Sequence, residues 1–280
     1  MTGEKATSDG IPKTVDPVAP VARRDLTAYL AWVTTPALCL LLVAAWWTYV
    51  DLSGISKFIL PTPASVWYAW LGLLLSQRAW IDTLMTVYAT LVGFLWAMVI
   101  GIGLGVLIAR VRWLEQTLNP FVVASQVLPK VALVPLFVVW FGFGITSKVL
   151  IAATLAFFPI LTNTVLGVKS IDQGHRDVMM SLNASRWQVF RKLELPSSLP
   201  YIVTGMEVGI VLAIIGAIVG EYLGGDQGLG HLLVARMNAF ETDGLFAVMI
   251  QMTILGFLFY FAISLLRRAL IPWHESTRRG

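Results

Sequence analysis

Five stretches of this sequence run for 20 residues or more without a charged side chain, and four of them are predicted to span a membrane. These four cover residues 26–50, 83–109, 149–168 and 244–266. A helix needs about 20 predominantly apolar residues to cross the roughly 30 Å hydrocarbon core of a bilayer. Charged residues make up only 13% of the 280-residue chain, about half the share that is usual in soluble domains. The sequence therefore predicts an all-α membrane protein.

Two further apolar runs are each interrupted by one ionisable residue. Lys130 interrupts 116–147, and Glu207 interrupts 195–220. Together with the four uncharged runs they predict six spans. The segment 58–77 is uncharged as well, but it contains Pro61 and Pro63 and then places several bulky apolar side chains on one helical face. These are Val66, Trp67, Trp70, Leu71 and Leu74. We expect an amphipathic helix that lies at the membrane interface after the first span.

The distribution of basic residues favours six spans with both termini in the cytoplasm. In this topology fifteen of the twenty Lys and Arg residues are cytoplasmic, and only Lys57, Arg78, Lys148 and Arg236 lie outside. A seventh span would place at best 12 inside and 7 outside, against the positive-inside rule. The predicted domains are a disordered cytoplasmic tail over 1–25, a transmembrane domain over 26–268 and a cytoplasmic tail over 269–280. The first apolar run is not followed by a cleavage site, so it is predicted to be a span rather than a signal peptide.

One cytoplasmic loop, 169–195, is much longer than the other connections. Its pattern predicts two short helices, over 176–182 and 186–193. Asn183 between them tolerates a left-handed turn, and Ser185 is a good N-cap for the second helix. Pro196 and Pro200 are expected to end the second helix and lead into the fifth span.

The spacing of this loop resembles the permease subunits of bacterial ABC importers. Their signature is Glu-Ala-Ala, three residues, Gly, nine residues, Ile, one residue, Leu-Pro. Here the spacing is kept, while the acid is shortened, both alanines are enlarged and the glycine is Asn. The matching positions are Asp177, Val178 and Met179, then Asn183, Leu193, Leu195 and Pro196.

Other motifs point to the nitrate, sulfonate and taurine branch of that family. The resemblance covers about residues 55–275. The motifs are Leu60-Pro61-x-Pro63, Leu128-Pro129-Lys130 leading through Pro135-Leu136 to Trp140-Phe141-Gly142, Glu221 followed by Gly228-Leu229-Gly230, and Pro272-Trp273-His274.

This resemblance implies the fold and the partners. The fold is that of a type I ABC importer, and the loop forms a coupling helix that contacts the ATPase through positions that include Ala184 and Ser185. Expected partners are two ATPase subunits, a periplasmic or lipid-anchored substrate-binding protein and a second copy of the chain, which makes a homodimer in the bacterial inner membrane. The implied cargo is a small, anionic solute such as nitrate, a sulfonate or taurine. The chain itself is not expected to be an enzyme or to bind a metal, a cofactor or nucleic acid, and ATP and magnesium belong on the partner ATPase.

Several alternatives remain open from the residues alone. The loop could instead be a basic, lipid-facing segment anchored by Trp187 and Phe190. An ion-coupled secondary transporter or channel would need carboxylates in its spans, and Glu207 alone is weak evidence for such a protein. A membrane-embedded enzyme would need clustered ligand residues, and none is seen. No Gly-Lys dipeptide occurs, so the chain has no P-loop lysine.

Three ionisable residues are candidates for the translocation pathway. Lys130 and Glu207 would each cost about 2.5–3.5 kcal/mol at the centre of a span if they faced lipid. Lys130 could hold an anionic group of the solute, with Glu207 as its partner or as a contact for a solute amine. Alternatively, Lys130 could extend to the interface while Glu207 makes a structural hydrogen bond. Glu221, at the outer end of the fifth span, is expected to be exposed and to serve as a gate, a helix end or a docking point.

The glycine-rich segment 224–230 is expected to be a mobile outer loop, which either docks a binding protein or is only a connection between spans. Gly101 and Gly105 are expected at a close helix contact.

Overall fold

The computed structural model describes residues 26–271, and every element in that range is helical. The chain forms two units, residues 1–49 and 50–280. The predicted tail 1–25 and the last nine residues of the predicted tail 269–280 lie outside the described range. Helix α1 (Leu26–Ser53) matches the first predicted span and carries Pro36 within its length.

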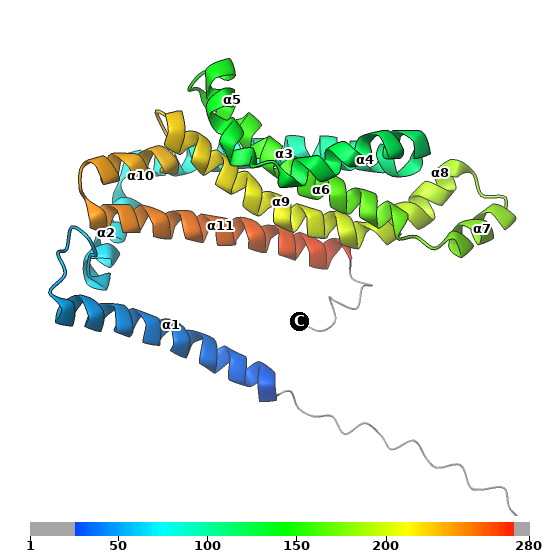
Figure 1. Ribbon diagram of the computed structural model, residues 1–280. Coiled ribbons are helices and arrows are strands. Elements are labelled where there is room, and N and C mark those ends of the chain that lie inside the picture. Colours follow the sequence, from blue (N-terminus) through cyan, green and yellow to red (C-terminus); the bar gives the residue numbers. More distant parts are fainter. Residues whose placement is uncertain (1–25, 272–280) are drawn as a thin grey trace, which may run out of the picture. The chain divides into compact units, whose positions relative to one another are not determined.

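Four long helices in the second unit match predicted spans. They are α3 (Gln77–Arg110), α6 (Ile145–Lys169), α9 (Leu195–Gly224) and α11 (Thr242–Leu270). Figure 1 shows them lying lengthwise beside one another. With α1, five helices of the described range are long and apolar enough to cross a membrane. The expected all-helical membrane fold is confirmed.

The run 116–147 does not form one straight helix. It is divided into α4 (Arg112–Val127), a 3₁₀ turn (Lys130–Leu133) and α5 (Val134–Phe141), and the two halves are bent by 90°. Leu128 is extended, as the residue before a proline must usually be, and Pro129 has no N–H to continue the helical ladder. The sixth span exists only if this bent pair is counted as one.

Helix α2 (Pro63–Leu75) confirms the helix predicted after the first span. The Thr62 side chain caps its N-terminus, and Pro63 occupies the first turn, where no N–H is needed. On the predicted face Trp67 and Leu71 are exposed and Val66 is buried, and Leu73, outside that face, is buried as well. The indole N–H of Trp70 donates to Gln251 Oε1 on α11 at 3.0 Å, which orients the inward face. Helix α2 is apolar all round, so its sequence did not single out one face.

The centre of the second unit is a contact of α6 with α3 on one side and α9 on the other. A Cβ added at Gly93 of α3 would lie 2.6 Å from the Ala152 Cβ, and one added at Gly216 of α9 would lie 2.9 Å from the Ala152 Cα. Gly101 and Gly105 are also packed against α6, which confirms the close helix contact expected there. In a membrane there is no hydrophobic driving force between helices. Backbones that approach this closely are therefore held together by dispersion contacts.

We predict that Gly93→Ala destabilises the protein and that Gly103→Ala does not. The first variant forces a methyl group into the Ala152 contact, at about 1–3 kcal/mol for overpacking. Gly103 lies on the exposed side of the same helix with open space around it, and alanine there raises helix propensity. Thermal unfolding of the detergent-solubilised chain checks this. Equal melting temperatures for the two variants would contradict the close packing.

Candidate functional site

The predicted coupling segment is a pair of short helices at one end of the second unit. They are α7 (Gln173–Ser181) and α8 (Arg186–Val189), and Figure 1 shows them beyond the ends of the long helices. Asn183 has φ +59°, so the left-handed turn is formed. Ser185 caps α8 in a capping box, in which Gln188 N–H donates to Ser185 Oγ and Ser185 N–H donates to Gln188 Oε1. Both local predictions are correct.

The second short helix does not end at the prolines, contrary to expectation. It continues from α8 through a π turn (Phe190–Glu194) directly into α9. Leu195 N–H donates to the Phe190 carbonyl across this wider turn. Pro196 then follows the π turn directly, at the start of α9, and it has no N–H to donate back into that turn. The tip of the loop is therefore joined to a spanning helix by continuous helix.

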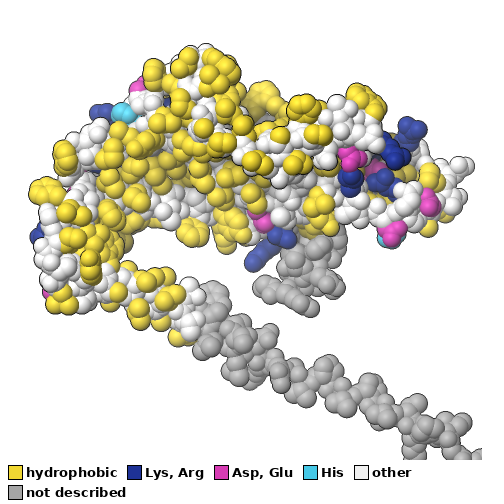
Figure 2. Space-filling view, in the orientation of Figure 1, with side chains coloured by type: hydrophobic (Ala, Val, Ile, Leu, Met, Phe, Trp, Pro, Cys, Tyr) yellow, Lys and Arg dark blue, Asp and Glu magenta, His cyan; other side chains and the backbone are white. Residues whose placement is uncertain are grey.

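The residues that match the family signature divide into an exposed and a partly covered group. Asp177, Val178, Asn183 and Ser185 are exposed, whereas Met179, Ala184, Leu193, Leu195 and Pro196 are half-buried. Figure 2 shows that Lys and Arg side chains gather over this end of the molecule. The exposed group is available to a partner, and the half-buried group holds the segment on the bundle.

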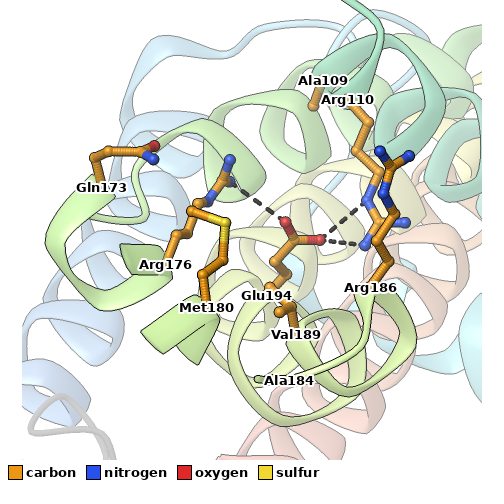
Figure 3. Close-up of a pocket in the computed structure, with 9 residues that line it drawn as sticks. All are labelled: Ala109, Arg110, Gln173, Arg176, Met180, Ala184, Arg186, Val189 and Glu194. Carbon is orange, nitrogen blue, oxygen red and sulfur yellow. Dashed lines mark hydrogen bonds and ion pairs between the residues drawn. The ribbon is translucent and has the colours of Figure 1, made fainter. Parts of the chain in front are cut away.

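A buried ion cluster at the base of this segment was missed by sequence reasoning. Glu194, 6% exposed, accepts from Arg110 Nε at 3.0 Å and lies 3.6 Å from Arg176 Nη2. Figure 3 shows both guanidinium groups converging on it. Arg176 also donates to the Val168 carbonyl at 3.0 Å, at the end of α6. The cluster therefore ties α3, α6, α7 and the start of α9 together.

The two ionisable residues inside the spans do not pair with each other. Glu207 on α9 is buried, and its Oε2 lies 3.1 Å from Arg267 Nη1 on α11. The ammonium group of Lys130 lies 5.0 Å from the centre of the Phe158 ring, at the bend between α4 and α5. The hypothesis of a Lys130–Glu207 pair is wrong. A basic residue 60 positions further along the chain supplies the missing partner of Glu207, and no local pattern indicates it.

Glu221 is buried rather than exposed, which corrects the sequence expectation. Only 1% of the residue is accessible. Its carboxylate accepts from the Thr86 hydroxyl at 2.8 Å and from Gly230 N–H at 2.9 Å. A buried carboxylate needs such donors because desolvation of the charge is costly. Glu221 cannot serve as an exposed docking point in this conformation.

The glycine-rich segment after α9 is bound to the bundle and is not a free loop. Gly228 N–H donates to Asp82 Oδ1 at 2.8 Å, and Leu229 N–H donates to Thr86 Oγ1 at 2.9 Å. Buried Lys148 on α6 donates to the Gln227 carbonyl at 2.7 Å. Helix α10 (Leu229–Asn238) starts directly after these contacts. Gly228 has φ +114°, a conformation that glycine adopts without strain.

We predict that Thr86→Val weakens the attachment of the glycine-rich segment to the bundle, whereas Thr90→Val does not. Thr86 donates to Glu221 and accepts from Leu229, so valine leaves the buried Leu229 N–H without its partner and removes one donor to the Glu221 carboxylate, at about 1–3 kcal/mol. Thr90 is equally buried, but its hydroxyl donates only to the Thr86 carbonyl within its own helix. Amide hydrogen exchange over 225–230 checks this. If both variants exchange at the same rate, Thr86 does not hold the glycine-rich segment on the bundle.

The comparisons with known proteins agree with this architecture. Residues 101–275 match the family model described as "Binding-protein-dependent transport system inner membrane component". The chain is 41% identical to the riboflavin transport system permease protein RibX of Chloroflexus aurantiacus, covering 86% of this chain and 90% of the relative. It is 35% identical to the formylaminopyrimidine transport permease protein ThiX of Halalkalibacterium halodurans, covering 84% and 94%. It is also 30% identical to the putative aliphatic sulfonates transport permease protein SsuC of Bacillus subtilis, covering 88% and 89%.

The fold is also found in a solved transporter. The chain resembles the inward-facing MetNI methionine ABC transporter with a TM-score of 0.59 at 21% identity, covering 68% of this chain and 96% of that chain. The expected type I importer fold is thereby confirmed. Members of the family are transport subunits that work with an ATPase and a substrate-binding protein. The chain belongs to the family of binding-protein-dependent transport system inner membrane components, the permease subunits of ABC importers.

Proposed function

We propose that the segment from α7 to the π turn docks on an ATPase subunit and drives the permease. In the assembly that we infer, two copies of this chain meet two ATPase subunits, which bind the ATP and magnesium, and a periplasmic or lipid-anchored binding protein. Both termini then lie in the cytoplasm of a bacterial cell. The excess of basic residues on that side supports this orientation.

The observation that carries the proposal is an exposed apolar tip on a rigid support. Leu182 in the turn and Trp187 on α8 are 73% and 65% exposed. Large apolar side chains that project on a charged segment are typical of a protein contact. Behind them, the capping box, the Glu194 cluster and the continuous helix into α9 hold the segment in one shape.

The geometry supports an alternating-access mechanism. Closure of two ATP-bound ATPase subunits draws the two coupling segments together. Each segment then pulls α9 directly through the π turn and pulls α3 through the Arg110–Glu194 pair. Because α3, α6 and α9 are closely packed, they move as one body and open the pathway outward. ATP hydrolysis releases the segments and restores the inward-facing state.

We predict that Leu182→Asn weakens association with the cognate ATPase at least about tenfold, which corresponds to about 1.4 kcal/mol. The tip loses an apolar anchor, while the fold keeps its contacts because Leu182 is exposed. Co-purification of the ATPase with the detergent-solubilised chain measures the effect.

The matched control is Leu75→Asn, at an even more exposed leucine that ends α2, at the opposite end of the second unit from α7 and α8. It should leave association unchanged. Equal loss in both variants, or solute uptake that continues after ATP depletion, would overturn the proposed function.

The cargo that we propose is a small solute with an anionic group, as the sulfonate relative supports. A second class, nitrogen heterocycles, is favoured by a separate observation. The two relatives above 30% identity described above are named for riboflavin and for a formylaminopyrimidine. A cation over an aromatic ring, as in Lys130 over Phe158, offers an anion a charge and offers a heterocycle a stacking surface.

We predict that Lys130→Met lowers solute uptake several-fold and that Lys130→Arg retains most of it. Lys130 is half-buried at the bend of a broken span, and irregular backbone at membrane depth is tolerated where it is buried in protein or lines a water-filled cavity. Uptake by the reconstituted importer, with taurine and riboflavin as the two probes, measures both cargo classes. Unchanged uptake by the methionine variant in an assembled complex would exclude Lys130 from the pathway.

A further inference from the structure

A cleft beside the coupling segment carries more positive charge than the fold requires. It lies between the end of α3, α7 and the α8–π turn, and its volume is about 420 Å³. Figure 3 shows arginine side chains from three elements at this cleft. The lining residues are Ala109, Arg110, Gln173, Arg176, Met180, Ala184, Arg186, Val189 and Glu194.

One carboxylate faces three guanidinium groups in this cleft. Glu194 is engaged by Arg110 and Arg176. Arg186 makes no hydrogen bond or ion pair with any residue in the described part of the chain. Two positive charges thus remain without compensation in a concave site. Guanidinium groups match phosphate oxygens with two parallel hydrogen bonds, so an anion that bears phosphate suits this lining.

The cleft lies where two spanning helices end. Arg110 is the last residue of α3, and Glu194 directly precedes α9. Trp113, at the start of α4 and close to Arg110, is exposed. Exposed tryptophans at the ends of spans are typical of the headgroup layer of a bilayer. Basic pockets between helices at the cytoplasmic face are typical lipid headgroup sites.

The size and lining of the cleft distinguish a lipid from a protein carboxylate. A single carboxylate from the ATPase would fill little of the 420 Å³, since a water molecule occupies about 30 Å³. Ala109, Met180 and Val189 give the cleft an apolar wall beside the arginines. A phosphate with a glycerol attached uses both surfaces.

We propose that this cleft binds the phosphate headgroup of an anionic phospholipid from the cytoplasmic leaflet. The bound headgroup bridges Arg110 at the end of α3 and Arg186 on α8, so it holds the coupling segment against the bundle beside the Glu194 cluster. This inference rests on the proposed function for the side of the membrane on which the cleft lies.

The test compares Arg186→Gln with Arg191→Gln in the assembled importer. Both variants remove one exposed positive charge from the same short segment, but only Arg186 lines the cleft. Retention of phosphatidylglycerol is measured by native mass spectrometry during detergent washing, and ATPase activity is measured in nanodiscs of phosphatidylglycerol or of phosphatidylcholine. We expect Arg186→Gln to lower phosphatidylglycerol retention at least fivefold and to abolish the difference in ATPase activity between the two lipids. Arg191→Gln should retain phosphatidylglycerol as the unmodified importer does and should keep the difference in ATPase activity between the two lipids.

Three results would overturn the inference. One is equal lipid retention by the two variants. A second is displacement of the lipid by millimolar glycerol phosphate or inorganic phosphate, which would make the ligand a free anion. A third is loss of the ATPase subunit from Arg186→Gln in both lipids, which would assign the cleft to the protein partner. ATPase co-purification is recorded in the same samples, so an importer that assembles normally but retains no lipid contradicts this inference alone.

Discussion

The structure depends on one close contact, in which Ala152 of α6 has glycine backbone on both sides. Gly93 of α3 and Gly216 of α9 leave no room there for even one more methyl group. Further along α6, Ile160 meets Gly101 of α3 and Gly209 of α9 in the same manner. Helices in lipid gain little from burying apolar surface, so their association depends on such close approach. Helix α6 is therefore fixed between its two neighbours along much of its length.

Polar groups join the two ends of this three-helix body to the shorter elements. At one end Thr86, Asp82 and Glu221 hold the start of α10. At the other end Glu194, with two arginines, holds α7 and the π turn. In each case a buried carboxylate accepts bonds from segments that are far apart in the sequence. A charge that is buried in this way is costly to strip of one partner, so these joints are stiff.

The parts of the fold that could be predicted from the sequence are those that depend on local patterns. Uncharged runs gave the spans, and the turn at Asn183 and the cap at Ser185 follow from backbone preferences of single residues. The burial of Glu221 could not be predicted, because its donor Thr86 is 135 positions away and a charge at a helix end is usually solvated. The Arg110–Glu194 pair joins residues 84 positions apart and was missed for the same reason. The π turn leaves no periodic signal, since it changes the helical repeat by a single residue.

That single residue sets the rotation of the coupling segment about the axis of α9. A π turn holds one residue more than an α-helical turn, and each residue of an α-helix advances by about 100°. Every side chain before Phe190 is therefore turned by about a quarter of a circle relative to an uninterrupted helix that continues to Glu207. The direction in which α8 presents its exposed face is therefore set, relative to α9, by the width of one turn. Relatives that differ by one residue in this turn would present a different face of α8 to the ATPase that we propose docks there.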